Sequence, residues 1–316
     1  MSEKTKKISV IGAGFVGATV AQRLLERRLS DVVLVDVVEG LAAGKALDMM
    51  ESAPLEGFDQ KIQGTTDLAA TTNSDIIVMT AGLARKPGMS RDDLLSKNAQ
   101  IVGGVIEKVA PLSPNAILII VTNPLDVMSW LAWKKSGFPK ERVIGMAGVL
   151  DSARFRYFIA EKLNVAPSKV EAMVLGGHGD TMVPLAAHIK VEGEPVSKKM
   201  SAQDLEQLVE RTRKGGAEIV ALLKSGSAWY APSSAVLEMI EGIVKNDRRV
   251  LPCCAWLEGQ FGLSETYCGV PVKLGTKGIE EIVVLELTER EKAALESSAR
   301  HVKEGIAKLK ELGFGN

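Results

Sequence analysis

The sequence predicts an α/β fold: a doubly wound parallel sheet, followed by a second domain of α+β type. Short β-branched segments alternate with longer amphipathic segments through the first 148 residues, and the pattern changes after that point. Strand, helix and strand repeated in this way form crossover units, whose strands run parallel. We therefore expect a first domain at residues 1–148 and a second, substrate-binding and catalytic domain at residues 149–316.

The expected strands of the first domain are short and apolar. The runs 75–82 and 116–124 contain almost only apolar side chains, which is typical of parallel strands buried on both faces. Acidic residues open the helix at 91–111, where they suit the positive end of its dipole. The other expected strands are 6–12, 31–36 and 142–148, and the other helices are 14–29 and 40–52.

The second half of the chain groups its strands instead of alternating them. Clustered strands followed by helices indicate an α+β domain. We expect helices at 150–165, 201–224, 229–245 and 288–312, hairpin-like strands around 170–175 and 182–191, and further strands at 248–256, 267–273 and 280–286.

Composition excludes several classes of function. Lys and Arg number 39, as do Asp and Glu, so the bulk charge favours neither nucleic acid nor an anionic membrane as a partner. No apolar run approaches the roughly 20 residues that span a bilayer, and no cluster with metal-ligand spacing is apparent. The odd number of cysteines predicts no disulfide scaffold and a cytoplasmic location; we expect small buried residues at Cys253, Cys254 and Cys268.

A glycine-rich turn follows the first expected strand and opens the first expected helix. Gly12, Gly14 and Gly17 have G-x-G-x-x-G spacing, which alone is a weak signal but here stands in the required context. Gly12 would allow the tight turn, Gly14 the close approach of a pyrophosphate, and Gly17 the packing of helix on strand. The helix N-terminus would offer N–H groups to the phosphates. The turn residues expected to bind a dinucleotide are Gly12, Ala13, Gly14, Phe15, Val16 and Gly17.

Asp36 ends the second expected strand, 19 residues after Gly17. A carboxylate at that point accepts hydrogen bonds from the ribose hydroxyls and repels a 2′-phosphate. The pattern therefore predicts a Rossmann domain that binds NAD in preference to NADP. The alternative is an ordinary tight turn followed by a solvated aspartate.

His178 lies between two glycines at a break in a strand-like run. Histidine titrates near neutral pH, and the flanking glycines let a ligand approach. Asp151 and Arg154 are three residues apart at the start of a helix, hence on one face. A carboxylate can orient an imidazole, and a guanidinium can grip a carboxylate, if the fold brings the three together. For His188 and His301 we expect structural roles.

Several motifs together resemble the lactate/malate dehydrogenase superfamily, and within it the lactate-dehydrogenase-like malate dehydrogenases. The resemblance runs nearly end to end, through "GAGFVG", "DVVEGLAAGKALDM", "TAGLARKPGMSRDDLL", "VTNPLDVM", "GMAGVLDSARFR", "LGGHGDTMVPL" and "SGSAWYAPSSA". It implies hydride transfer between NAD and a 2-hydroxy acid.

The resemblance also implies roles for individual residues. His178 would be the proton donor and acceptor, and Asp151 its carboxylate partner. Arg154 would bind the substrate's C1 carboxylate, and Arg91 would polarise the reacting carbonyl from a lid. The remaining implied contacts are Asn123 near substrate and nicotinamide, Asn98 on the nucleotide, Val121 and Thr122 in the cofactor-facing turn, and Ser227 facing the substrate.

Arg85, six residues before Arg91, predicts the substrate. The family's lactate enzymes carry an uncharged residue there, typically Gln. An arginine in a closed lid would pair with the second carboxylate of malate or oxaloacetate, and pyruvate would leave it desolvated and unpaired. The resemblance thus favours a malate dehydrogenase of the tricarboxylic acid cycle. A dehydrogenase for lactate or another 2-hydroxy acid, and a non-catalytic dinucleotide-binding sensor, are the alternatives. The family implies a homo-oligomer, with a tetramer favoured over a dimer.

Overall fold

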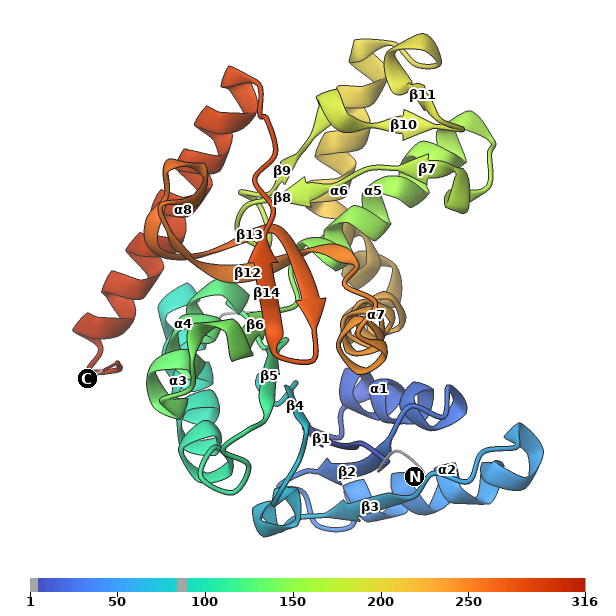
Figure 1. Ribbon diagram of the computed structural model, residues 1–316, viewed down its shortest axis with the longest axis vertical. Helices are drawn as coiled ribbons and strands as arrows, with labels where there is room; N and C mark the ends of the chain where they lie inside the picture. Colours follow the sequence, from blue (N-terminus) through green and yellow to red (C-terminus); the bar gives the residue numbers. More distant parts are fainter. Residues whose placement is uncertain (1–4, 84–89, 316) are drawn as a thin grey trace.

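One nine-stranded sheet forms the centre of the molecule, in a computed structural model that describes residues 5–83 and 90–315 (Figure 1). The strands follow the order β14-β13-β12-β6-β5-β4-β1-β2-β3. Six of them are parallel, as the alternating sequence pattern predicts. They are β1 (Lys7–Ile11), β2 (Asp31–Val35), β3 (Ile62–Thr65), β4 (Ile76–Met79), β5 (Ile117–Ile120) and β6 (Val143–Gly145).

Helices cover both faces of the parallel strands, which confirms the Rossmann arrangement (Figure 1). The order of the strands reverses between β1 and β4, and ligands of such sheets bind beyond the carboxyl ends of the strands at that point. The helices are α1 (Phe15–Glu26), α2 (Leu41–Glu56), α3 (Arg91–Val109), α4 (Leu125–Ser136), α5 (Gly148–Leu163), α6 (Ala202–Leu223), α7 (Tyr230–Lys245) and α8 (Glu289–Glu311).

Two elements of the first half escape the sequence patterns. All residues of α4 from Leu125 to Ala132 are buried, so the helix shows no polar face and no amphipathic period. The edge strand β3 is only four residues long and contains Gly64, whose added Cβ would lie 2.1 Å from the carbonyl oxygen of Ala42 in α2. A strand this short has too few apolar residues to form a pattern from which it could be predicted.

The C-terminal strands extend the same sheet. β12 (Val250–Glu258) runs antiparallel to β6, where Cys254 pairs with Gly145, and β13 (Ser264–Gly275) and β14 (Gly278–Ile282) follow at the edge. Gly145 allows the close approach, because a Cβ there would lie 2.7 Å from the Cβ of Cys254. Segments from the second half of the chain thus meet the carboxyl end of β6.

Two smaller antiparallel sheets complete the second half, as its hairpin-like segments predict. Near them, α5 packs against α6, while α8 runs along one side of the molecule against β13 (Figure 1). The short strands are β7 (Val170–Glu171), β8 (Val174–Leu175), β9 (Val183–Pro184), β10 (Lys190–Val191) and β11 (Glu194–Pro195).

The three cysteines are buried on β12 and β13 and are unpaired, which confirms the expectation of small core residues. Across residues 5–83 and 90–315, no helix combines the length and apolarity that crossing a bilayer would require.

Candidate active site

The glycine turn between β1 and α1 has the geometry that its spacing predicts. Gly12 has a φ of +103°, and a Cβ there would lie 2.8 Å from the amide nitrogen of Ala81. At Gly17 a Cβ would lie 1.9 Å from the carbonyl oxygen of Gly12, so only glycine lets the helix pack on the turn. Around Gly14 a Cβ would meet no described atom within 4 Å, which leaves its backbone open to a ligand.

Asp36 and Lys45 hold this turn from two sides. Asp36 accepts hydrogen bonds from the amide nitrogens of Ala13 (2.7 Å) and Val38 (3.0 Å). The Nζ of Lys45 in α2 donates to the carbonyl oxygen of Ala13 at 2.6 Å. The aspartate therefore lies at the turn, where the sequence places it, and its contact with a ribose stays a prediction. Lys45 was not predicted, because a lone lysine in a helix has no distinctive signal.

Phe15 and Val16 complete the turn. The ring of Phe15 is 64% exposed and stacks on Trp229, which precedes α7, with centroids 4.8 Å apart. Val16 is partly buried, and its carbonyl oxygen accepts a hydrogen bond from the hydroxyl of Ser233 at 3.0 Å. The first turn of α1 is thus braced by α7.

The segments after β4 and β5 are joined by Asn98 of α3. Its fully buried amide accepts from the nitrogen of Leu83 (2.7 Å) and donates to the carbonyl oxygens of Leu83 (3.1 Å) and Asn123 (2.7 Å). Its visible role is to hold two strand ends together, and direct contact with a nucleotide stays a prediction. Thr122 is similarly occupied, donating to the carbonyl oxygen of Ala81 at 2.7 Å, and Val121 is partly buried.

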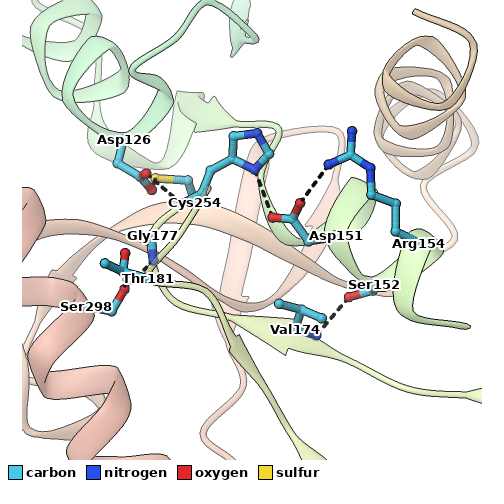
Figure 2. Close-up of polar contacts among 10 residues, drawn as sticks. Asp126, Asp151, Ser152, Arg154, Val174, Gly177, Thr181, Cys254 and Ser298 are labelled. Carbon is cyan, nitrogen blue, oxygen red and sulfur yellow. Dashed lines mark hydrogen bonds and ion pairs between the residues drawn. The ribbon is translucent and has the colours of Figure 1, made fainter. Parts of the chain in front are cut away.

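The fold brings His178, Asp151 and Arg154 together, as the sequence hypothesis requires. The Nδ1 of His178 lies 2.8 Å from Oδ2 of Asp151, and the other oxygen of that carboxylate lies 3.6 Å from Nη1 of Arg154. In Figure 2, Asp151 projects from α5 between the imidazole and the guanidinium. Because Asp151 occupies Nδ1, the Nε2 of His178 is the nitrogen that can exchange a proton with a ligand.

Electrostatics at this group follow from burial and charge. Burial alone would lower the pKa of His178, but the charge and hydrogen bond of Asp151, helped by Asp126, raise the pKa above its ordinary 6.5. Arg154 is 13% exposed, and burial lowers its pKa, although Asp151 opposes that shift. Its Nε has no acceptor among the described residues. A desolvated guanidinium with a free donor is suited to binding a carboxylate.

Gly215 of α6 makes room for Arg154, and Gly216 lies next to it with ordinary spacing. A Cβ at Gly215 would lie 3.2 Å from Cδ of Arg154, and a Cβ at Gly216 would lie 3.9 Å from its Nη1. Glycines inside a helix cost stability, which indicates that space beside the guanidinium matters here. The sequence signal was the pair "GG" within an otherwise good helix.

The segment carrying His178 is anchored by residues that the sequence hypothesis did not include. The amide nitrogen of Gly177 donates to Oγ of Ser298, and that of His178 donates to Oδ2 of Asp126, each at 2.8 Å. Gly176 has a φ of +84° and pairs with Gly269 of β13. The signal for Asp126 is a lone acidic residue in the first turn of a helix whose residues 125–132 are otherwise almost all apolar.

A cavity of 770 Å³ opens beside His178. Asn123, whose exposed side chain follows β5, and Leu95 of α3 line it together with His178. His301 lies on the exposed side of α8 and lines the same cavity. His188 belongs to the short 3₁₀ turn Ala186–His188, and its Nε2 lies 2.9 Å from the carbonyl oxygen of Glu286, with which it forms a hydrogen bond. The cavity can hold a ligand between the strand ends and the imidazole.

Three predicted contacts are less fully described. Arg85 lies outside the described residues. Arg91 begins α3, but its side chain also lies outside them. Ser227 is exposed in the segment between α6 and α7, and its contact with a substrate stays a prediction.

Comparison with known proteins agrees with this geometry along the whole chain. Residues 6–145 match the NAD binding domain of lactate/malate dehydrogenase, and residues 148–312 match the alpha/beta C-terminal domain of the same family. A malate dehydrogenase of Roseiflexus castenholzii is 53% identical, over 97% of this chain and 99% of the relative.

Solved structures give the same result. A malate dehydrogenase from Salinibacter ruber is 50% identical with a TM-score of 0.93, covering 97% of this chain and 98% of that one. A lactate dehydrogenase from Cryptosporidium parvum, complexed with lactic acid and NAD, is 40% identical with a TM-score of 0.94 over the same shares. The chain belongs to the lactate/malate dehydrogenase family.

Proposed function

We propose that the protein is an NAD-dependent malate dehydrogenase, which interconverts (S)-malate and oxaloacetate. The observation that carries the proposal is the buried group of His178, Asp151 and Arg154, in which His178 also lines a cavity at the strand ends. The match to an NAD binding domain and the open backbone at Gly14 fit the cofactor, which when bound supplies the hydride acceptor and donor.

His178 would move the proton. During reduction of oxaloacetate its imidazolium donates the Nε2 proton to the oxygen of the reacting carbonyl, and during oxidation of malate the neutral ring accepts the hydroxyl proton. Asp151 holds Nδ1, which fixes the tautomer and stabilises the imidazolium. Acid–base help of this kind contributes about 10²–10⁴-fold to the rate.

Arg154 would bind the C1 carboxylate of the substrate. Its guanidinium is largely desolvated and has a donor without an acceptor among the described residues, so a bidentate carboxylate would complete its hydrogen bonds. Arg91, at the start of α3, would polarise the carbonyl. Contacts of Asn123 and Ser227 with substrate, and of Asp36 and Asn98 with nucleotide, belong to the same proposal.

The fold does not decide between malate and lactate, since a lactate dehydrogenase is as similar in structure as the malate enzymes. Two observations favour malate: curated relatives at 53–56% identity are named malate dehydrogenases, and Arg85 provides a charge for a second carboxylate. Oxidation of NADH with oxaloacetate and with pyruvate tests the choice. An equal or higher kcat/KM for pyruvate would refute it, whereas NADH binding without any turnover would favour the sensor alternative.

The Arg85→Gln variant tests the source of specificity. We expect kcat/KM for oxaloacetate to fall by about tenfold or more, as for loss of a charged contact of roughly 1.4 kcal/mol, while kcat/KM for pyruvate holds or rises. Steady-state assays with both substrates measure the change. Equal losses for the two substrates would show that Arg85 has no selective role.

The same proposal includes the domain boundary, the cellular location and the oligomeric state. We infer a division at residues 148/149, a cytoplasmic enzyme of the tricarboxylic acid cycle, and a homotetramer in preference to a dimer. Exposed apolar side chains on two helices support self-association, because large exposed apolar groups mark contact surfaces: Leu47 (63%) and Leu55 (89%) on α2, and Leu222 (75%) on α6. Sedimentation of the purified protein measures the number of subunits.

A further inference from the structure

Three consecutive residues before and at the imidazole are held by three different elements. Gly176 bonds the backbone of Gly269 in β13, Gly177 bonds the hydroxyl of Ser298 in α8, and His178 bonds the carboxylate of Asp126 in α4. Figure 2 shows Asp126 on the opposite side of Gly177 from Ser298. A neutral carbonyl or hydroxyl suffices at the first two anchors. Burying a carboxylate at the third costs desolvation energy, which points to a role beyond holding a loop.

The two oxygens of the Asp126 carboxylate both face hydrogen-bond donors. Oδ2 accepts from the amide nitrogen of His178 at 2.8 Å, and Oδ1 accepts from Sγ of Cys254 at 3.1 Å (Figure 2). Burial raises the pKa of the Cys254 thiol well above its ordinary value, so the sulfur keeps its proton. The Asp126 side chain is 5% exposed, and each of its two oxygens accepts a hydrogen bond. This arrangement fits an ionised carboxylate, whose oxygens are both acceptors.

The charge balance of Asp126 has opposing contributions. Burial raises the pKa of Asp126, and the hydrogen bonds from Cys254 and His178 and the charge of the imidazolium act against that rise. In return, the negative charge of Asp126 favours the protonated imidazole, in the same direction as Asp151. Arg154 acts in the opposite direction.

Other ionisable groups share the cavity with His178. They come from α3, from the segment that carries the imidazole and from α8, and they line the cavity beside the ring: Asp92, Asp180, His301, Glu304 and Lys308. Asp151 and Asp126 are buried and hydrogen-bonded to His178 itself, so their charges are screened least by solvent.

We propose that Asp126, held by the thiol of Cys254, is a positioning residue for proton transfer: it fixes the backbone of His178 and adds a second negative charge that favours the imidazolium. α4 begins at Leu125, two residues after Asn123, beyond the carboxyl end of β5. The carboxylate therefore ties the strand ends of the first half of the chain to the imidazole of the second half. The kinetic consequence rests on the proposed function, whereas the electrostatic one does not.

The Asp126→Asn variant separates the two parts of this role. Asparagine keeps an oxygen that can accept from the amide nitrogen of His178, but it removes the charge. We expect the pKa of His178 in the free protein to fall by about half a unit or more, as for loss of a nearby opposite charge. Titration of the imidazole signals by NMR measures this shift, and the chain has only three histidines to resolve.

Kinetics provide a second readout in the same variant. Above the pKa of His178, kcat/KM for oxaloacetate should fall by about threefold for a half-unit shift, because the imidazolium fraction falls with the pKa. The KM for NADH should not change.

Glu291→Gln is the matched control for Asp126→Asn. Glu291 is also a buried carboxylate, 6% exposed, that accepts hydrogen bonds from the backbone nitrogens of Ala187 and Thr288. It should leave the titration of His178 unchanged.

The outcomes are distinct. A folded Asp126→Asn protein in which His178 titrates as in the Glu291→Gln control would overturn the proposal. If Asp126→Asn does not fold, Cys254→Ala takes its place: loss of the thiol donor weakens ionisation of Asp126, so the pKa of His178 should shift down by a smaller amount, and no shift would again overturn it. Absence of oxaloacetate turnover in the unaltered protein would refute the proposed function and leave the titration test intact.

Discussion

The glycine turn and the group around His178 are built in opposite ways. The turn takes Gly12, Gly14, Gly17 and Asp36 from one short stretch of chain, and neighbouring strands complete it. The group around His178 instead takes its side chains from α4, α5, a loop and β12. On the proposed roles, cofactor binding would therefore depend on local backbone geometry, whereas proton transfer would depend on distant segments that the sheet holds together. The two regions should fail separately when they are altered.

The largest expected effect comes from His178→Asn. If His178 is the proton donor, as proposed, its loss should lower kcat for oxaloacetate by about 10²–10⁴-fold. The dissociation constant for NADH, measured by fluorescence titration, should stay unchanged because the glycine turn is untouched. His188→Gln serves as control, since His188 is exposed, bonds the backbone oxygen of Glu286 and does not line the cavity beside His178. A parallel loss of NADH affinity would break the distinction between the two regions.

Gly14→Val should have the converse effect. The φ of Gly14 is −66°, which any residue can adopt, and no described atom lies within 4 Å of an added Cβ. The fold should therefore persist in the variant. The new side chain would occupy the space beside the turn, and we expect NADH binding to weaken by about tenfold or more, or roughly 1.4 kcal/mol. Thermal melting and NADH titration measure the two expectations.

Gly104→Val in α3 is the matched control for this change, because an added Cβ there also meets nothing within 4 Å. It should leave NADH affinity as it is. If Gly14→Val binds NADH as tightly as the control, the open backbone at Gly14 is not where the cofactor approaches.

Gly215→Ala is the smallest change and tests the room beside Arg154. The added Cβ would lie 3.2 Å from Cδ of Arg154, so the guanidinium must shift by a few tenths of an ångström. We expect the KM for oxaloacetate to rise by about threefold, while the helix gains up to about 1 kcal/mol in stability from the loss of glycine. At Gly216 the nearest atoms to an added Cβ are the terminal nitrogens of Arg154 at 3.9 Å, an ordinary contact, and Gly216→Ala should leave KM unchanged. Equal KM values in the two variants would show that this spacing is unimportant.

This contrast also explains what sequence reasoning could predict. Alternating strands and helices, the glycine spacing and Asp36 are local patterns, and the structure places them as expected. The three-residue spacing of Asp151 and Arg154 puts both on one face of α5, which the 3.6 Å ion pair confirms. Their meeting with His178 depends on the fold, and the sequence could offer it only as a hypothesis.

The residues that were missed act through tertiary contacts. Asp126 lies in the stretch of α4 that is buried on all sides, where no amphipathic pattern marks a special position. Its partners follow 52 and 128 residues later. Lys45 supports a turn 32 residues before it. No spacing rule links such pairs, because the sheet brings them together rather than a shared helix or strand.

The most direct test of His178 as proton donor and acceptor is the pH dependence of kcat/KM in both directions. The pKa of His178 is raised above 6.5. In the proposed mechanism, reduction of oxaloacetate would need the imidazolium. Reduction should therefore be level at low pH and fall about tenfold per unit above that raised pKa, while malate oxidation rises through the same pKa. A flat profile, or an apparent pKa below 6.5, would contradict the role assigned to His178.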